Sequence, residues 1–130
     1  MNDINATIGL CNLPHMKMIV EKCRENAKYL SENYKDGKVI HPYNEDFKAS
    51  YWLFTVLVEN KAEYIEKMKE KGFMVSQVHQ RNDTHSCFSE FKVDLPNLDY
   101  LEKRLVCIPC GWWVTAPQRD HIIDAIRGGW

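Results

Sequence analysis

The sequence has no apolar run long enough to cross a membrane. Its longest, YWLFTVLV at 51–58, is far shorter than the roughly 20 residues that a spanning helix needs. It also has no excess of positive charge, since the formal net charge at pH 7 is −1, and this argues against nucleic acid and anionic membranes as partners. The opening stretch MNDINATIGL lacks the basic and apolar regions of a signal peptide. These absences predict a cytoplasmic protein with one hydrophobic core.

A disulfide framework is also missing. The chain has five cysteines, an odd number without the spacing of a small cross-linked scaffold, which predicts free thiols in a reducing compartment. Cys107 and Cys110 form a CIPC pair, but LVCIPC has the pattern of a buried strand that enters a turn. We therefore favour a structural role for this pair over metal or redox chemistry.

Two helices are expected at the N-terminus. Ile4, Ile8 and Cys11 share one helical face, and Pro14 then interrupts or restarts the helix. The helix that follows, from about residue 16 to 34, has an apolar stripe and is roughly 30 Å long at 1.5 Å per residue. Such a length exceeds the needs of a small core and suggests that the helix reaches another unit.

The remaining residues alternate between strands and helices. We expect strands at 51–58, 73–78 and 105–109, with helices at 60–72, 96–104 and 115–127. The helical connection should make the first two strands parallel, and the third could lie between them in a mixed sheet. The predicted fold is α+β, with a small three-stranded, possibly mixed sheet packed against helices and preceded by two N-terminal helices, one of them long. We divide the chain into linking helices at 1–34 and a single compact α+β domain at 35–130.

The most polar stretch is VSQVHQRNDTHSCFSE at 75–90. A metal could be bound by His79, Asp83, His85 and Cys87, but their spacing is irregular and the intervening residues are typical of turns. We therefore predict no metal site. A purely structural alternative is that His79 ends a strand in a satisfied hydrogen bond while Asp83 helps to cap a turn.

Several segments in unbroken order resemble the DegT-type sugar aminotransferases, which are fold type I pyridoxal-phosphate enzymes that act on nucleotide-linked keto sugars. The similarity covers nearly the whole chain, and its most distinctive part is VHQRND followed by a short-helix LPNLD segment. The segments that carry it are MNDINATIGLCNL, YWLFTVLVE, VHQRNDTHSCF, LPNLDYLEKRLVCIPCGWWVT and HIIDAIRGGW. The resemblance is to the C-terminal small domain with its linking helices.

This resemblance implies that the chain is a fragment. In the family, the lysine that holds the cofactor, the carboxylate for its ring nitrogen and most phosphate-binding groups belong to the preceding large domain. No lysine here lies in a segment that resembles the cofactor-lysine motif. We therefore expect no catalytic residue and no cofactor site in this chain, with pyridoxal phosphate bound only by the full-length parent, which could be an aminotransferase or a related dehydratase. The chain alone should be inactive.

The resemblance also implies that the loop after the second expected strand faces the active-site cleft. His79 could then donate to a sugar hydroxyl or a phosphate oxygen, Arg81 could pair with the diphosphate, and His85 is a further candidate for binding the substrate. Trp112 and Trp113 should point to opposite sides of an extended segment, so at least one is exposed or at an interface. They could stack on a sugar, although packing between domains is the better interpretation.

Two other functions stay open. The chain could be a stand-alone binding or dimerisation module that uses its apolar N-terminal helices, or a metal protein that uses the loop at 75–90. The expected partners are the large domain of the parent enzyme and a second copy of the chain. We predict a homodimer, because without the large domain the two helices would expose more apolar surface than a monomer usually tolerates.

Overall fold

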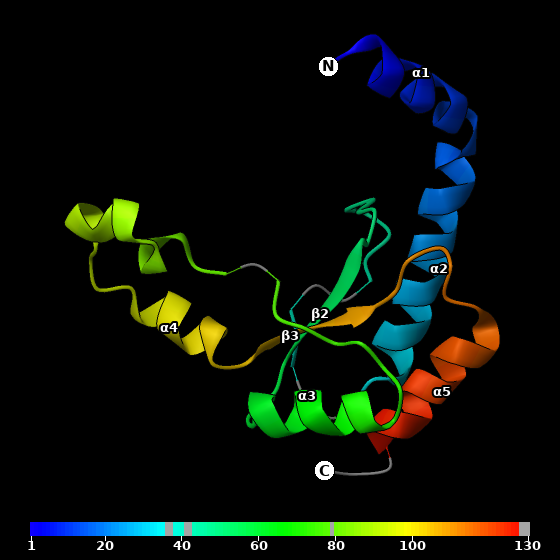
Figure 1. Ribbon diagram of the computed structural model, residues 1–130. Coiled ribbons are helices and arrows are strands. Elements are labelled where there is room, and N and C mark those ends of the chain that lie inside the picture. The colour runs from blue at the N-terminus through cyan, green and yellow to red at the C-terminus, as the bar shows by residue number, and fades with distance from the viewer. Residues whose placement is uncertain (36–37, 41–42, 79, 128–130) are drawn as a thin grey trace.

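The protein is described by a computed structural model that covers residues 1–35, 38–40, 43–78 and 80–127. Figure 1 shows a small sheet with helices around it and two parts that project from this body. Among the described residues, no helix is both long enough and apolar enough to cross a membrane. The helical elements are α1 (Asp3–Asn12), η1 (Leu13–His15), α2 (Met16–Asn33), α3 (Lys61–Glu70), η2 (Asn82–Thr84), η3 (Ser86–Phe91), α4 (Pro96–Glu102) and α5 (Ala116–Arg127).

The predicted sheet, with strands at 51–58, 73–78 and 105–109, is wrong, although the α+β class is correct. The sheet is built on two five-residue antiparallel strands, β2 (Leu53–Leu57) and β3 (Leu105–Pro109), and a two-residue strand, β1 (Lys38–Val39), pairs antiparallel with the outer edge of β2. The segment expected as a strand at 73–78 forms only one isolated bridge, between Ser76 and Cys107. Consequently the expected parallel pair of strands at 51–58 and 73–78 does not form.

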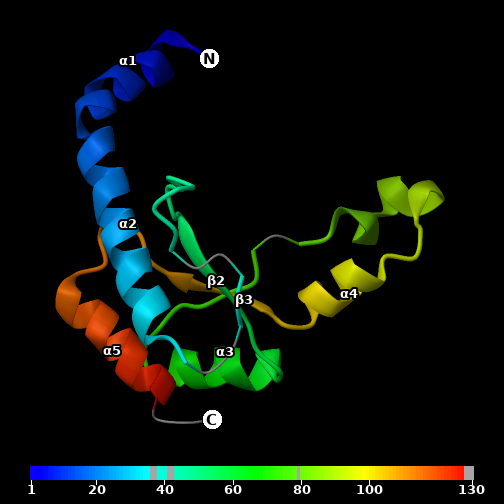
Figure 2. The same ribbon diagram turned by 180° about the vertical axis from the view of Figure 1, so that it is seen from behind.

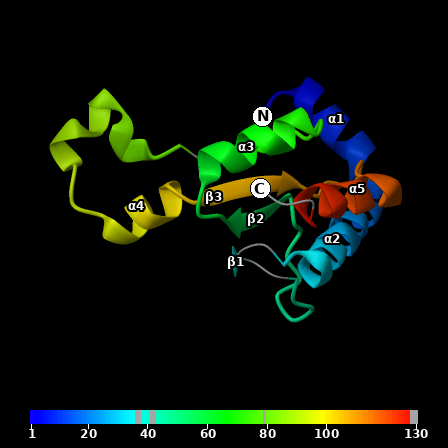
Figure 3. The same cartoon turned by 90° about the horizontal axis from the view of Figure 1, so that it is seen from below.

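The core lies where α2, α3 and α5 cover the two long strands (Figure 3). Phe54 of β2 is opposite Ile108 of β3, and Val56 is opposite Val106, and all four side chains are buried. α2 and α5 lie side by side (Figure 2), and their core residues follow the apolar stripes expected from the sequence. These residues are Cys23, Ala27 and Leu30 in α2, and Ile122, Ile123, Ala125 and Ile126 in α5.

The helix starts also follow sequence signals. Asn60 caps α3 by accepting a hydrogen bond from the backbone N–H of Glu63, and its own amide donates to the Glu63 carboxylate at 2.7 Å. At the start of α5, the Gln118 side chain accepts a hydrogen bond from the Thr115 backbone N–H at 2.9 Å. Both pairs have the residue types and the three-residue spacing of a capping box.

The first projection is the N-terminal arm, which we define as residues 1–18. It comprises α1, η1 and the start of α2, and it extends well beyond the sheet in Figures 1 and 2. α1 and η1 contain no buried residue. The arm is nevertheless rich in large apolar side chains that are exposed: Met1, Ile4, Ile8, Leu10, Leu13, Met16 and Met18.

The second projection, which we call the excursion, is residues 80–102. It leaves the body after the Ser76 bridge, forms η2 and η3, and returns through α4 to β3 (Figure 1). None of its three helical elements contains a buried residue. Its exposed apolar side chains are Phe88, Phe91, Val93, Leu95, Leu98 and Tyr100. The predicted boundary between domains at residue 34 stays a prediction, and the second half of α2 belongs to the core.

Candidate functional site

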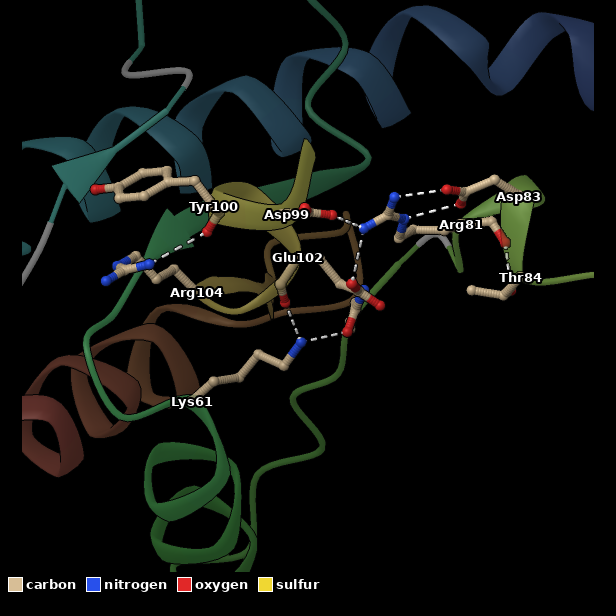
Figure 4. A network of polar contacts seen from close by, with 9 residues as sticks. Lys61, Arg81, Asp83, Thr84, Asp99, Tyr100, Glu102 and Arg104 are labelled. Atoms are coloured by element: carbon tan, nitrogen blue, oxygen red, sulfur yellow. Dashed lines mark hydrogen bonds and ion pairs between the residues drawn. The ribbon is translucent and has the colours of Figure 1, made fainter. Parts of the chain in front are cut away.

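An ion-pair network centred on Arg81 joins the two ends of the excursion (Figure 4). The Arg81 guanidinium donates twice to Asp83, from Nε to Oδ1 at 2.8 Å and from Nη2 to Oδ2 at 2.6 Å. Its Nη1 donates to Asp99 and, at 3.3 Å, to Glu102, both in α4. The Arg81 side chain is 12% exposed, so these ion pairs are better shielded than ordinary surface pairs. One arginine thereby ties three carboxylates to the same point.

The network continues to α3 through Glu102. Lys61, at the start of α3, donates from Nζ both to the Glu102 backbone oxygen and to the Gln77 side-chain oxygen. Glu102 therefore contacts Arg81 through its carboxylate and Lys61 through its carbonyl (Figure 4). As a result, two positions of the segment that enters the excursion, Gln77 and Arg81, are both held against the end of α4.

The network has a clear electrostatic effect. Hydrogen bonds from Arg81, together with its positive charge, lower the pKa of Asp83 below its ordinary value of 3.8. The hydrogen bonds that Arg81 donates to Asp83 and Asp99 raise its pKa above its already high value. Asp83 is therefore ionised near neutral pH, and Arg81 keeps its charge.

A hollow of about 760 Å³ lies beside this network. Its walls are mostly apolar, while amide and charged side chains lie along one part of it, a combination typical of ligand sites. The apolar residues are Val78, Leu95, Leu98, Leu101 and Leu105, and the polar residues are Gln77, Gln80, Arg81, Asn82, Asp83 and Glu102.

The three residues predicted to bind the substrate lie in different places relative to the hollow. His79 lies outside the described residues. Arg81 lines the hollow, but its donors are already engaged by carboxylates. His85 is exposed between η2 and η3, and its backbone N–H donates to the Asn82 oxygen at 3.1 Å. None of these observations tests a contact with substrate, so all three assignments stay predictions.

The metal candidates are not gathered into a site within the described ranges, where no three His, Cys, Asp or Glu groups are placed to hold an ion. His79 is outside those ranges, and the predicted lack of a metal therefore stays a prediction. Asp83 pairs with Arg81, while Cys87 is an exposed free thiol. Cys107 and Cys110 are free and buried, and burial raises the pKa of the Cys110 thiol to about 12. Such a thiol is a poor nucleophile and metal ligand.

The described residues do not fit pyridoxal phosphate. A lysine that holds this cofactor must be desolvated beside it, but the one buried polar or charged residue in the described part of the chain is Asn26. Lys61 and Lys67 are half-buried, and each is engaged, Lys61 with Gln77 and Glu102 and Lys67 with Glu63 at 2.7 Å. No step through the cofactor follows from these side chains.

A second organised feature is the turn at 111–114. The Asn26 amide donates to the backbone oxygens of Gly111 and Val114, each at 3.0 Å, and so fixes a turn on which Trp112 and Trp113 are both exposed. Their rings meet edge to face, with centroids 6.2 Å apart. The Asn26 contact was missed by the sequence analysis. Its signal was a polar residue three positions after Cys23 and four before Leu30, on the apolar stripe of the long helix.

Comparison with known proteins identifies the family. Residues 1–127 match the DegT/DnrJ/EryC1/StrS aminotransferase family. The chain belongs to this family. The match spans almost the whole chain, including the N-terminal arm, the excursion and the turn at 111–114. The resemblance to DegT-type enzymes drawn from the sequence is confirmed at the level of the family.

Individual relatives match nearly the whole chain, and two of them are solved structures with the same fold. The sugar aminotransferase CalS13 from Micromonospora echinospora is 32% identical with a TM-score of 0.91, and the match covers 100% of this chain and 36% of CalS13. AtS13 from Actinomadura melliaura is 34% identical with a TM-score of 0.92, covering 100% of this chain and 35% of AtS13. An uncharacterised protein of Methanocaldococcus jannaschii, MJ1066, is 22% identical over 98% of this chain and 36% of its own length. The chain thus spans little more than a third of these relatives.

Proposed function

We propose that this chain is the C-terminal small domain of a pyridoxal-phosphate-dependent aminotransferase that acts on nucleotide-linked keto sugars. The observation that carries the proposal is the likeness to the sugar aminotransferase CalS13, at 32% identity over all of this chain. Because the chain spans 36% of CalS13, a larger part must supply the remaining functions. That part is the first proposed partner. A related dehydratase of the same family would be built in the same way.

The role of the chain in this enzyme is to bind and orient the sugar nucleotide. Pyridoxal phosphate, held by the larger part, would supply the electron sink for transfer of the amino group. In this chain, the apolar walls of the hollow would cover the apolar face of a sugar ring, and the amides of Gln77, Gln80 and Asn82 could bond its hydroxyls. His79 and His85 are proposed as further contacts. Positioning alone does not lower the reaction barrier, so the chain is inactive by itself.

The exposed apolar surfaces support a missing partner. The N-terminal arm has no buried residue in α1, yet it carries large apolar side chains along its length. Apolar surface of this extent marks a site of association. The larger part of the enzyme is proposed to cover this apolar surface. The cytoplasmic location stays a prediction.

Complementation tests the proposal. The part of AtS13 that this chain does not match would be produced separately and assayed with pyridoxal phosphate, an amino donor and a keto-sugar nucleotide. We expect no turnover from either part alone and measurable turnover from the mixture. Turnover by this chain alone would contradict the proposal, and so would a stable complex that stays inactive.

The second candidate function is a stand-alone dimerisation module. The exposed apolar side chains of the N-terminal arm favour it, because two copies of the chain could bury these side chains against each other symmetrically. A chain that forms a tight dimer and shows no binding to the AtS13 part would support this alternative.

A further inference from the structure

Gln77 and Arg81 are four residues apart, and both are linked to Glu102, Gln77 through Lys61 and Arg81 directly. Lys61 donates to the Gln77 side chain and to the Glu102 carbonyl. Arg81 donates to the Glu102 carboxylate at 3.3 Å. Gln77 and Arg81 are therefore both held against Glu102, the last residue of α4.

We infer that Arg81 is a positioning residue, which sets the course of the substrate-binding loop, and that it does not itself bind the diphosphate of a sugar nucleotide. The effect of Arg81 on catalysis rests on the proposed function, whereas the contacts that make it a positioning residue lie within this chain. It replaces the diphosphate contact that the sequence suggested for Arg81.

The hydrogen-bonding capacity of Arg81 supports this role. A guanidinium binds a phosphate best through two parallel N–H groups on one edge. In Arg81 the edge formed by Nε and Nη2 is occupied by Asp83, at 2.8 Å and 2.6 Å. The remaining nitrogen, Nη1, donates to Asp99 and Glu102. A diphosphate would have to displace a carboxylate from a side chain that is 12% exposed.

The local charge points in the same direction. Arg81 brings one positive charge, whereas Asp83, Asp99 and Glu102 bring three negative charges within hydrogen-bonding or ion-pairing distance of it. Lys61 adds a positive charge on the other side of Glu102. An anionic ligand placed at Arg81 would meet repulsion from the carboxylates, because like charges at these distances disfavour binding.

Two variants separate positioning from phosphate binding. Asp83→Asn weakens the hold on Arg81 and removes a negative charge, so a phosphate-binding Arg81 would bind uridine diphosphate more tightly. Arg81→Lys keeps the positive charge but loses the planar guanidinium, which binds Asp83 through Nε and Nη2. Arg104→Gln is the matched control. Arg104 also lies beside α4, where it donates to the Tyr100 oxygen, and it pairs with Glu59 at 3.3 Å. Within the described residues, none of its hydrogen bonds or ion pairs reaches Arg81 or Gln77.

The first readout is amide hydrogen exchange of the described residues from 76 to 83 in the chain alone. We expect exchange about 10-fold faster or more in Asp83→Asn and Arg81→Lys, because bonds to charged groups are lost. Exchange in β2 and β3 should not change, nor should exchange of this segment in Arg104→Gln. Unchanged exchange in both Arg81 network variants would overturn the inference, as would tighter binding of uridine diphosphate by Asp83→Asn.

The second readout is steady-state kinetics of the mixture with the AtS13 part. Arg81→Lys should raise KM for the sugar nucleotide about 10-fold while kcat stays within about twofold. An unchanged KM would overturn the positioning role. If the unsubstituted mixture shows no turnover, the proposed function fails, whereas hydrogen exchange still decides the role of Arg81.

Discussion

The side-chain amide of Asn26 donates to the backbone oxygen of Gly111 at 3.0 Å, across 85 residues of sequence. A second bond of the same length reaches the Val114 oxygen, and Asn26 is 3% exposed. α2 therefore fixes the turn that carries Trp112 and Trp113. Because both carbonyl groups accept hydrogen bonds from the same amide, this contact couples the long helix to the turn that follows β3.

Replacing Asn26 should destabilise the protein strongly. Asn26→Ala leaves the buried Val114 carbonyl without its donor and removes one of the two donors to the Gly111 carbonyl, which still accepts from the Val114 backbone N–H at 3.0 Å. We expect the free energy of unfolding to fall by about 1–3 kcal/mol. Asn26→Asp should be no better, since a carboxylate cannot donate to a carbonyl. Urea denaturation measures both. The control is Asn12→Ala in the exposed helix α1, expected to cost less than about 0.5 kcal/mol. Equal losses at the two positions would contradict the role of Asn26.

Gly111 and Gly72 should respond to alanine for different reasons. A Cβ at Gly111 would lie 2.4 Å from the Trp113 ring, so Gly111→Ala must move this exposed indole and change tryptophan fluorescence, at a cost of about 0.5–1.5 kcal/mol. Gly72 has open space around it but a φ of +86°, so Gly72→Ala should cost about 1–2 kcal/mol with unchanged fluorescence. Unaltered fluorescence in Gly111→Ala would show that the ring does not rest on this glycine.

The Asp83 ion pair should make stability depend on pH in the acidic range. Its pKa in the folded protein is lowered from 3.8, so its contribution is complete above that value and is lost as the pH falls through the lower folded pKa. Asp99 and Glu102 face the same guanidinium, and Lys92 acts on Asp83 from the excursion. These groups are present in both proteins when the original chain is compared with Asp83→Asn.

The free energy of unfolding should therefore be higher in the original chain than in Asp83→Asn at pH 6, and the difference should shrink below about pH 3.8. Denaturation curves at pH 6, 4 and 3 supply the measurement. A difference that stays constant over this range would mean that ionisation of Asp83 does not stabilise the fold.

The N-terminal arm should cause self-association when the chain is alone. Ile8 and Leu13 are exposed and belong to helices without buried residues, so changing them cannot disturb the core. We expect a species heavier than the monomer in sedimentation at micromolar concentration, and a monomer for Ile8→Glu combined with Leu13→Glu. Asn5→Glu on the same helix is the control and should still associate. A monomeric original chain would refute the prediction.

The parts of the fold that were predictable from sequence are those with local signals. The strand at 105–109 and most of that at 51–58 show the expected apolar pattern, and the helix caps at Asn60 and Thr115 have the right residues at fixed spacing. The strand expected at 73–78 failed because its β-forming residues find one pairing partner, at Cys107, before the excursion leads the chain away. β1 was missed because two residues between turn formers carry no periodic signal.

The site was less predictable than the fold. Asp83 is two residues from Arg81, and this pairing could have been proposed from the sequence. Asp99 and Glu102 are 18 and 21 residues away from Arg81, and Lys61 is 41 residues from Glu102. Only the return of α4 beside the start of the excursion brings them together. The family resemblance identified the loop, but not which of its side chains are committed to each other.

We propose that this chain contributes to a sugar aminotransferase without holding pyridoxal phosphate itself. Reductive trapping with borohydride in the presence of pyridoxal phosphate, followed by peptide mapping, is the decisive experiment. We expect a low yield spread over several exposed lysines, such as Lys17 and Lys69, without saturation at one residue. Stoichiometric labelling of a single lysine, saturable in pyridoxal phosphate and abolished when that lysine is replaced by alanine, would contradict the claim.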